Sequence, residues 1–253
     1  MELPNIQDFE ASKLGTKSYW DTVYDRENDN FKEIGDIGEI WFGEESVEKM
    51  VEWVTEQATD PDTSIIDLGC GNGHLLLELS QEGYRNLHGI DYSESAIKLA
   101  KAVAKERGLD WIRYDAVDFL TNPNWAGSMK YKLILDKGTY DAISLHPDQV
   151  TAKKEGLPGP REKYVESVRQ LIDPKDGYFL ISSCNWTKEE LIENFKQCKS
   201  YLGYALFKYN QKLTTLFIRY IDFTFHSNVE YPVFEFGGHS GSKIVTVAFT
   251  LNQ

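Results

Sequence analysis

Residues Ile65 to Gly73 combine a short apolar run, an acid and three glycines at alternate positions. The apolar run suits a buried strand of a parallel sheet. Glycine permits a turn with positive φ and lets a ligand approach the bare backbone. The Leu-rich segment 74–82 has helical character, so its first N–H groups face whatever lies over the loop. A strand, a glycine loop and a helix in this order predict an α/β unit that binds a nucleotide-like ligand.

The spacing of the glycines distinguishes between ligands. Dinucleotide folds carry Gly-x-Gly-x-x-Gly, because a pyrophosphate must lie on the helix N-terminus. Here the spacing is Gly69-x-Gly71-x-Gly73, and Asp67 precedes it. This pattern resembles motif I of class I S-adenosylmethionine-dependent methyltransferases. Their cofactor has a cationic sulfonium and no phosphate, so an acid near the loop attracts it. A glycine turn without a ligand and an NAD site are the alternatives.

Two more acids stand at the ends of predicted strands. Residues 87–91 predict a strand that ends at Asp91, where a carboxylate accepts both ribose hydroxyls. Residues 111–116 predict another strand, and in this fold Asp115 would accept the adenine amino group. Each acid alone is more often a solvated residue, but three at successive strand ends predict S-adenosylmethionine binding. The expected cofactor contacts are Asp67, Gly69, Cys70, Gly71, Asn72, Gly73, Asp91, Tyr92, Asp115, Ala116 and Trp41.

Strands and helices alternate along the rest of the chain, which predicts a mostly parallel sheet. We expect helix N-caps at Ser46 and Ser93, and a capping box from Thr187 to Glu190. Gly108 should end the helix that Ser93 begins. Further strands are expected at residues 133–136, 178–182 and 243–249, the last closing an antiparallel hairpin.

These elements predict an α/β fold of the Rossmann-like class I methyltransferase type. We expect seven strands, with helices on both faces, over residues 46–253. Residues 1–45 are acidic and aromatic, and we expect them to form a cap on this domain because disordered segments contain few aromatics. Residues 203–229 hold an aromatic stretch that we expect to be an atypical insertion.

Length and composition limit the class of protein. A chain of 253 residues suits one α/β domain with appendages. No run of 18 apolar residues occurs, so no membrane span is expected. Cys70, Cys184 and Cys198 are widely spaced, no CxxC is present and the five histidines are scattered. This pattern predicts no metal site and favours a reduced, cytoplasmic environment.

The net charge of −13 is unevenly distributed, because residues 1–60 hold 16 acids and only 5 bases. Such a field repels nucleic acid and attracts a basic partner. We expect Glu27, Asp29 and Glu33 to contribute to it. The alternative is an acidic face that only keeps the protein soluble.

Motifs after the cofactor residues extend the resemblance. Residues 135–142 read Leu-Asp-Lys-Gly-Thr-Tyr-Asp-Ala where nucleic-acid amino-methyltransferases carry Asn/Asp-Pro-Pro-aromatic. This box resembles a group of eukaryotic protein-lysine methyltransferases. Segments 12–21, 38–43, 184–187 and 236–241 are similar to the Efm4/METTL-ten type in that group. The resemblance implies methylation of a lysine of translation elongation factor 1-alpha. We expect a monomer with a basic protein as its substrate.

The resemblance makes a lysine ε-amine the methyl acceptor, and that amine must first lose its proton. With a pKa near 10.4, holding it neutral at pH 7 costs roughly 4–5 kcal/mol, and a partly dry pocket lowers this cost. We expect Asp136, at the end of a strand, to orient the amine. Tyr140, Trp186 and Trp41 are candidate pocket walls, with ordinary core packing as the alternative. His146 is a candidate base or a surface-loop histidine.

Two other functions stay open from the sequence. A methyltransferase for a small metabolite or lipid would share the same cofactor loop. A catalytically silent subunit would bind the cofactor without turning it over, although the intact glycines and acids argue against this function.

Overall fold

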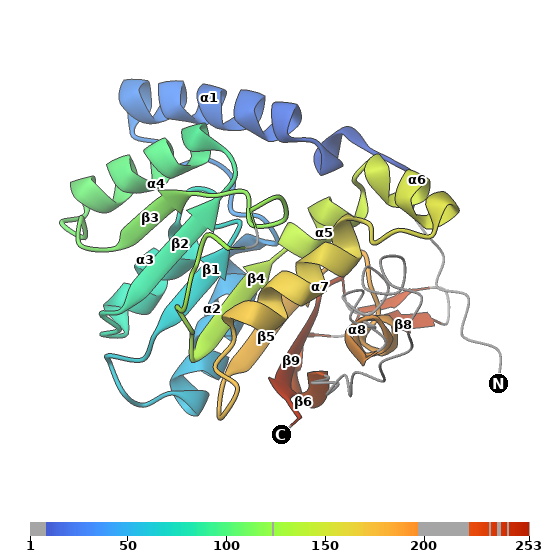
Figure 1. Cartoon of the computed structure of the whole chain (residues 1–253). Coiled ribbons are helices and arrows are strands. Elements are labelled where there is room, and N and C mark those ends of the chain that lie inside the picture. The colour runs from blue at the N-terminus through green and yellow to red at the C-terminus, as the bar shows by residue number, and fades with distance from the viewer. Residues whose placement is uncertain are drawn as a thin grey trace.

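The computed structural model describes residues 9–122, 124–196, 223–232, 234–236, 239–241 and 243–252. Its centre is a seven-stranded sheet of order β3-β2-β1-β4-β5-β9-β6 (Figure 1). Five neighbouring strands are parallel, and β9 is antiparallel to both β5 and β6. The predicted fold class is therefore confirmed. The strands are β1 (Ile65–Leu68), β2 (Leu87–Asp91), β3 (Arg113–Ala116), β4 (Leu133–Lys137), β5 (Tyr178–Ser183), β6 (Phe223–Val229) and β9 (Val245–Leu251), with β7 (Phe234–Phe236) and β8 (His239–Gly241) as a separate pair.

Helices cover both faces of the sheet and enclose two apolar cores. The first core contains residues of α2 (Gly43–Gln57), α3 (His74–Gln81) and α4 (Glu94–Glu106). The second contains residues of α5 (Thr139–Ser144), α7 (Pro160–Leu171) and α8 (Lys188–Lys196). Side chains alternate between faces along a strand, so Ile65 joins the first core and Ile66 the second. A short helix, α6 (Asp148–Glu155), follows α5.

The N-terminal segment contains a 3₁₀ turn, η1 (Lys13–Gly15), and the 18-residue helix α1 (Lys17–Ile34). In Figure 1 α1 runs across the top of the molecule beside α4. The Asn28 amide donates a hydrogen bond to the carbonyl of Ser95 in α4 at 2.8 Å. The sequence predicts a cap here but no long helix. Its signal was the helical spacing of Trp20, Tyr24 and Phe31.

Three of the predicted helix ends are confirmed. At the N-cap of α4, the Ser93 hydroxyl accepts a hydrogen bond from the Ala96 amide at 3.4 Å. Gly108, with φ of 71°, follows α4 directly after its C-cap. Before α8, the Thr187 amide donates to Glu190 at 2.9 Å, and the Glu190 amide donates to the Thr187 hydroxyl at 3.2 Å, as a capping box requires.

The expected N-cap at Ser46 is wrong. The N-cap of α2 is Phe42, four residues earlier, and the helix begins at Gly43. Ser46 lies inside the first turn and donates to the Gly43 carbonyl at 2.9 Å. The acids Glu44 and Glu45 occupy that first turn, where the helix dipole favours negative charge.

The segment expected to be an insertion, 203–229, is described only from residue 223 onward. That part forms β6, which pairs with β9 at the edge of the sheet. Residues 203–222 and Cys198 lie outside the described residues. None of the helices in the described part of the chain has the length and apolar character that a membrane span requires.

Candidate functional site

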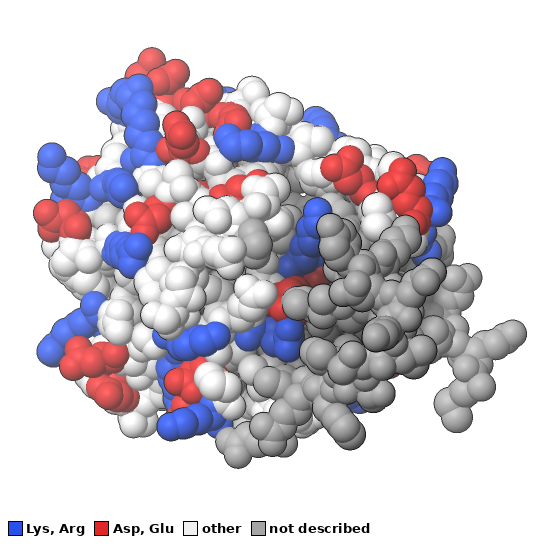
Figure 2. Space-filling view, in the orientation of Figure 1, with Lys and Arg blue, Asp and Glu red and all other residues white. Residues whose placement is uncertain are grey.

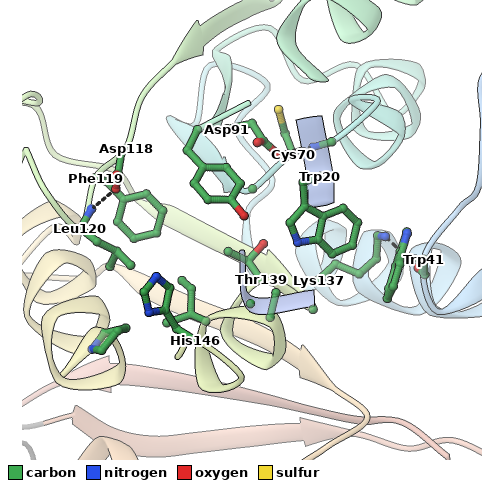
Figure 3. Close-up of a pocket in the computed structure, with 18 of the residues that line it drawn as sticks. Trp20, Trp41, Cys70, Asp91, Asp118, Phe119, Leu120, Lys137, Thr139 and His146 are labelled. Atoms are coloured by element: carbon green, nitrogen blue, oxygen red, sulfur yellow. Dashed lines mark hydrogen bonds between the residues drawn. The ribbon is translucent and has the colours of Figure 1, made fainter. Parts of the chain in front are cut away.

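A pocket lies over the carboxyl ends of β1, β2 and β4, and the N-terminal segment forms one of its walls (Figure 3). Open α/β sheets place their ligands at this end. The loops after these strands and two N-terminal stretches supply the lining. Among the lining residues are Gly69, Cys70, Gly71, Asn72, Asp91, Tyr92, Asp118, Phe119, Leu120, Lys137, Thr139, Ile143 and His146, with Trp20, Tyr24, Glu39 and Trp41 from the N-terminal side.

The glycine loop is crowded on its pocket side. Gly69 and Gly71 have φ of 69° and 53°, which L side chains rarely adopt. A Cβ atom on Gly69 would lie 2.1 Å from the Thr139 hydroxyl, and one on Gly71 would lie 2.4 Å from the Tyr24 hydroxyl. The first two glycines of the motif are therefore required by both backbone conformation and space.

Asp91 ends β2 with its carboxylate held by two backbone donors. The Gly71 amide donates to one oxygen at 3.1 Å, and the Ser93 amide donates to the other at 2.9 Å. Burial raises the pKa of Asp91 to about 6, although both amides favour the charged form. The carboxylate lines the pocket in a fixed orientation, as recognition of ribose hydroxyls requires.

Aromatic rings of the N-terminal segment form one wall of the pocket. Trp20 stacks on Tyr24 with ring centroids 6.1 Å apart and meets Trp41 edge to face at 4.9 Å. The Trp20 indole N–H donates to the Leu14 carbonyl at 2.7 Å, which orients the ring. In Figure 3 Trp20 projects into the space between Asp91 and Lys137. Such faces accommodate the methylene chain and cationic end of a lysine.

Seven of the eleven expected cofactor contacts line this pocket, namely Gly69, Cys70, Gly71, Asn72, Asp91, Tyr92 and Trp41. Asp67 is buried beneath the loop, where burial raises its pKa to about 7. Gly73 is the N-cap of α3 instead, with φ of 79°. Asp115 and Ala116 lie in β3, off the pocket lining. All these cofactor roles stay predictions.

The structure separates Asp115 from the pocket. Its carboxylate accepts a hydrogen bond from Arg113 at 2.7 Å and contacts the His88 ring at 3.0 Å. Asp118 is the lining acid that follows β3, beside Phe119 and Leu120. It lies two residues beyond the end of the strand, where a strand-end pattern does not reach. The adenine role of Asp115 stays a prediction, and Asp118 is the acid after β3 that lines the pocket.

The three expected catalytic residues lie behind the pocket lining. The Asp136 carboxylate accepts hydrogen bonds from the Thr139 and Tyr140 amides at 2.8 and 2.9 Å, and from the Tyr164 hydroxyl. It thus holds the first turn of α5, and burial raises its pKa to about 8. Tyr140 and Trp186 are buried in the second apolar core, with ring centroids 6.0 Å apart. Direct contact of these residues with a substrate stays a prediction.

His146 lies at the other end of the pocket, after α5. The Asp148 amide donates to its Nδ1 at 3.0 Å. In the neutral ring the other nitrogen, Nε2, then carries the hydrogen. This tautomer makes Nε2 a donor rather than a base.

Of the three acids expected to attract a basic partner, only two lie on the surface. Glu27 is buried, and its carboxylate accepts hydrogen bonds from Arg26 at 2.6 Å and Asn30 at 3.4 Å. It therefore does not contribute to long-range attraction as expected. Asp29 and Glu33 are exposed. Among the described residues visible in Figure 2, Lys and Arg are interspersed with Asp and Glu. No cluster of three His, Cys, Asp or Glu that could hold a metal occurs in the described part of the chain.

Comparisons with known proteins place this pocket in context. Residues 59–238 match a model of the methyltransferase domain. The mouse protein EEF1A lysine methyltransferase 2 is 42% identical over 242 residues, which cover 96% of this chain and 85% of its own. The Schizosaccharomyces pombe protein-lysine N-methyltransferase efm4 is 39% identical over 256 residues, covering 95% of both chains.

The fold is also similar to solved structures. Magnesium protoporphyrin IX methyltransferase from Synechocystis PCC 6803, with bound SAM, matches with a TM-score of 0.59 and 14% identity. The match covers 96% of this chain and 99% of that chain. At such low identity the similarity concerns the fold alone.

Proposed function

The chain belongs to the family of class I methyltransferases that includes EEF1A lysine methyltransferase 2 and efm4, and we propose that it transfers methyl groups from S-adenosylmethionine to a lysine ε-amine of elongation factor 1-alpha. The observation that carries this proposal is identity of 36–42% over nearly the whole chain to five relatives named as EEF1A or protein-lysine methyltransferases. Neither a metabolite nor a lipid enzyme is among them.

The residues present fit the cofactor. When bound, S-adenosylmethionine supplies a methyl group activated by its sulfonium. Gly69 and Gly71 line the pocket with bare backbone, which the amino acid end of the cofactor can approach closely. The fixed Asp91 carboxylate is the ribose acceptor. The apolar side chains of Phe119 and Leu120 suit the faces of an adenine.

The amine enters from the α5 side of the pocket. Trp20, Trp41 and Ile143 provide apolar walls there, and Thr139 lies beside them. Such walls exclude water and lower the pKa of a lysine amine by disfavouring its charged form. Holding the neutral amine in line with the methyl group then supplies most of the remaining rate. Asp136 supports this geometry through α5, because it fixes the amides of Thr139 and Tyr140.

The substrate surface that docks is proposed to be basic. The exposed acids of the N-terminal segment, among them Asp29, Glu33 and Asp36, provide the complementary charge. We further propose that the protein acts as a monomer in the cytoplasm. The absence of CxxC pairs in the sequence is consistent with a reduced compartment.

The proposal is tested by incubating the purified protein with labelled S-adenosylmethionine and a cell lysate. We expect one protein band at the mass of elongation factor 1-alpha, with the label in lysine. An Asp91→Ala variant serves as the inactive control. Label only in the small-molecule or lipid fraction would replace this function by the metabolite alternative. No label in any fraction would leave a cofactor-binding protein without activity.

A further inference from the structure

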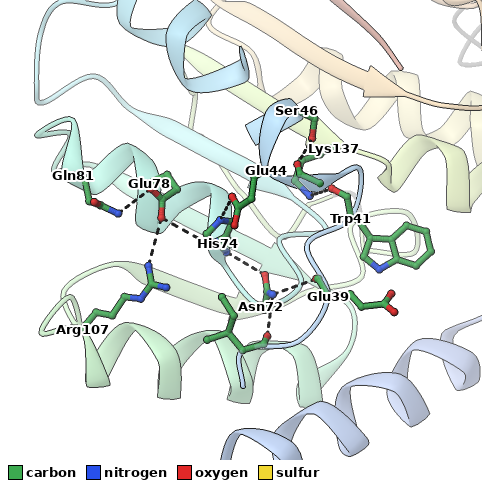
Figure 4. Close-up of polar contacts among 12 residues, drawn as sticks. Glu39, Trp41, Glu44, Ser46, Asn72, His74, Glu78, Gln81, Arg107 and Lys137 are labelled. Carbon is green, nitrogen blue, oxygen red and sulfur yellow. Dashed lines mark hydrogen bonds and ion pairs between the residues drawn. The ribbon is translucent and has the colours of Figure 1, made fainter. Parts of the chain in front are cut away.

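Residues 37–44, which we call the strap, join α1 to α2 across the glycine loop (Figure 4). The Asn72 amide of the loop donates to the carbonyls of Ile37 and Glu39 at 3.0 and 3.4 Å. Further along, Glu44 contacts the His74 ring at 3.0 Å. The strap is therefore attached directly to the loop predicted to bind the cofactor.

The strap also contributes to the pocket. Glu39 and Trp41 line it, and the Trp41 indole packs on Trp20. The next residue, Phe42, has φ of 67° and is the one non-glycine residue with positive φ in the described part of the chain. A bulky residue in this conformation is held there only by its surroundings. Strain of this kind often accompanies a functional constraint.

The surroundings that hold the strap come from the end of β4. The Lys137 ammonium donates a hydrogen bond to the Trp41 carbonyl at 2.8 Å (Figures 3 and 4). The Phe42 ring rests on Gly138, where a Cβ would lie 2.9 Å from the ring. Two consecutive residues of the Asp-Lys-Gly-Thr box thus fix two consecutive residues of the strap.

Lys137 is mostly removed from water. Burial lowers the pKa of Lys137, while Asp67, Asp136 and Glu44 act in the opposite direction. These three carboxylates belong to β1, β4 and α2. A buried ammonium is costly unless it is paired and hydrogen-bonded, and the Trp41 carbonyl supplies a hydrogen bond.

We propose that Lys137 is a positioning residue, which holds the Trp41 side of the strap as a wall of the methyl-transfer pocket. It acts through the Trp41 carbonyl, and its role rests on the proposed lysine methylation. Because Asn72 holds the other end of the strap, loss of Lys137 should displace Trp41 while leaving the glycine loop in place. The amine channel should then be impaired more than cofactor binding.

The test uses three variants of the full chain, Lys137→Met, Lys137→Arg and the control Lys49→Met. Lys49 lies in α2, and its ammonium pairs with Glu52 at 2.8 Å, outside the pocket. With fluorotryptophan incorporated, ¹⁹F NMR reports each indole, and single substitutions of Trp20, Trp41, Trp53 and Trp111 by Phe assign the four signals. We expect Lys137→Met to move the Trp41 and Trp20 signals and leave those of Trp53 and Trp111 unchanged. Lys137→Arg, which keeps a long donor, should restore them.

Turnover provides the second measurement. We expect Lys137→Met to lower kcat at least tenfold with cofactor affinity within threefold, and Lys137→Arg to recover most of the loss. The pH–rate profile should keep its shape. Unmoved indole signals in folded Lys137→Met would overturn the proposal. A shift of the acid limb of the pH–rate profile by about one pH unit would also overturn the proposal, because it would make Lys137 a proton acceptor.

Two further controls keep the result interpretable. If Lys137→Met does not fold, Lys137→Ala, whose side chain also lacks a donor, carries the same expectations. The NMR measurement needs no substrate, so it tests the positioning role even if the wild-type protein methylates nothing. Absence of wild-type turnover would contradict the proposed function alone.

Discussion

Replacing Gly71 by alanine tests the crowded glycine loop. The left-handed backbone at φ of 53° costs an alanine about 1–2 kcal/mol. The new Cβ would also lie 2.4 Å from the Tyr24 hydroxyl, so the ring must move, at about 1–3 kcal/mol by analogy with overpacked cores. We expect the free energy of unfolding to fall by the sum of these two costs. For a chain of this length, Tm should fall by about 2 °C for each kcal/mol lost.

A matched control separates the two costs. Gly127 has φ of 55°, close to that of Gly71, but a Cβ there has nothing within 4 Å. Gly127→Ala should therefore cost only the backbone term. In the double variant Gly71→Ala, Tyr24→Phe the nearest ring atom is Cζ, 3.3 Å away, a contact that a small shift relieves. The double-mutant cycle should then show a coupling of about 1–3 kcal/mol.

The assays are urea unfolding for stability and calorimetry for cofactor affinity. Because the Gly71 amide donates to Asp91, displacement of the loop should also weaken cofactor binding by about tenfold or more, as loss of a buried hydrogen bond to a charge does. Equal destabilisation by Gly71→Ala and Gly127→Ala, with no rescue by Tyr24→Phe, would refute the crowding argument. Unchanged cofactor affinity would mean that the site lies elsewhere.

Three other predictions concern charged groups. If the ionised Asp91 is the ribose acceptor, its pKa of about 6 predicts a cofactor affinity that is level above pH 7, about half its maximum at pH 6, and lower by up to tenfold per unit below that; calorimetry on Asp91→Asn should give weak, level binding. Asp136→Ala should lower turnover at least tenfold and leave cofactor affinity within a few-fold of the wild type. It should also destabilise the chain by about 3 kcal/mol, because three donors lose their acceptor. Full turnover with normal stability would show that Asp136 has no role in either. If the exposed acids steer a basic substrate, kcat/KM should fall as the Debye length shrinks from about 10 Å at 0.1 M salt to about 3 Å at 1 M. Neutralising Asp29, Glu33 and Asp36 should make kcat/KM depend less on salt. If kcat/KM of the wild type does not change with salt, these acids have a role in solubility only.

The sequence was sufficient for the sheet and the glycine loop because both depend on local patterns. Apolar runs mark the parallel strands, and alternate glycines mark a turn with positive φ. Asp91 was found for the same reason, since it ends a strand. Asp118 was missed because it lies in a loop beyond β3, where no periodic pattern identifies the pocket side.

Long-range contacts explain the remaining differences. Nothing local distinguishes Glu27, which is buried, from Asp29, which is exposed in the same helix. Asp136 ends a strand as Asp91 does, yet its carboxylate turns to the α5 amides and Tyr164. The direction of a strand-end carboxylate depends on which donors surround it, and those come from residues distant in sequence. The strap contact between Lys137 and Trp41 spans 96 positions and was not predictable for the same reason.

Methylation of purified elongation factor 1-alpha is the decisive test of the proposed function. The protein, the unmethylated factor and S-adenosylmethionine are incubated, and peptides of the factor are analysed by mass spectrometry over time. We predict a gain of one or more methyl groups on a lysine, at a rate proportional to enzyme concentration, with at least a tenfold loss of rate in Asp91→Ala. An unmodified factor, with the wild-type protein folded and cofactor bound, would contradict it.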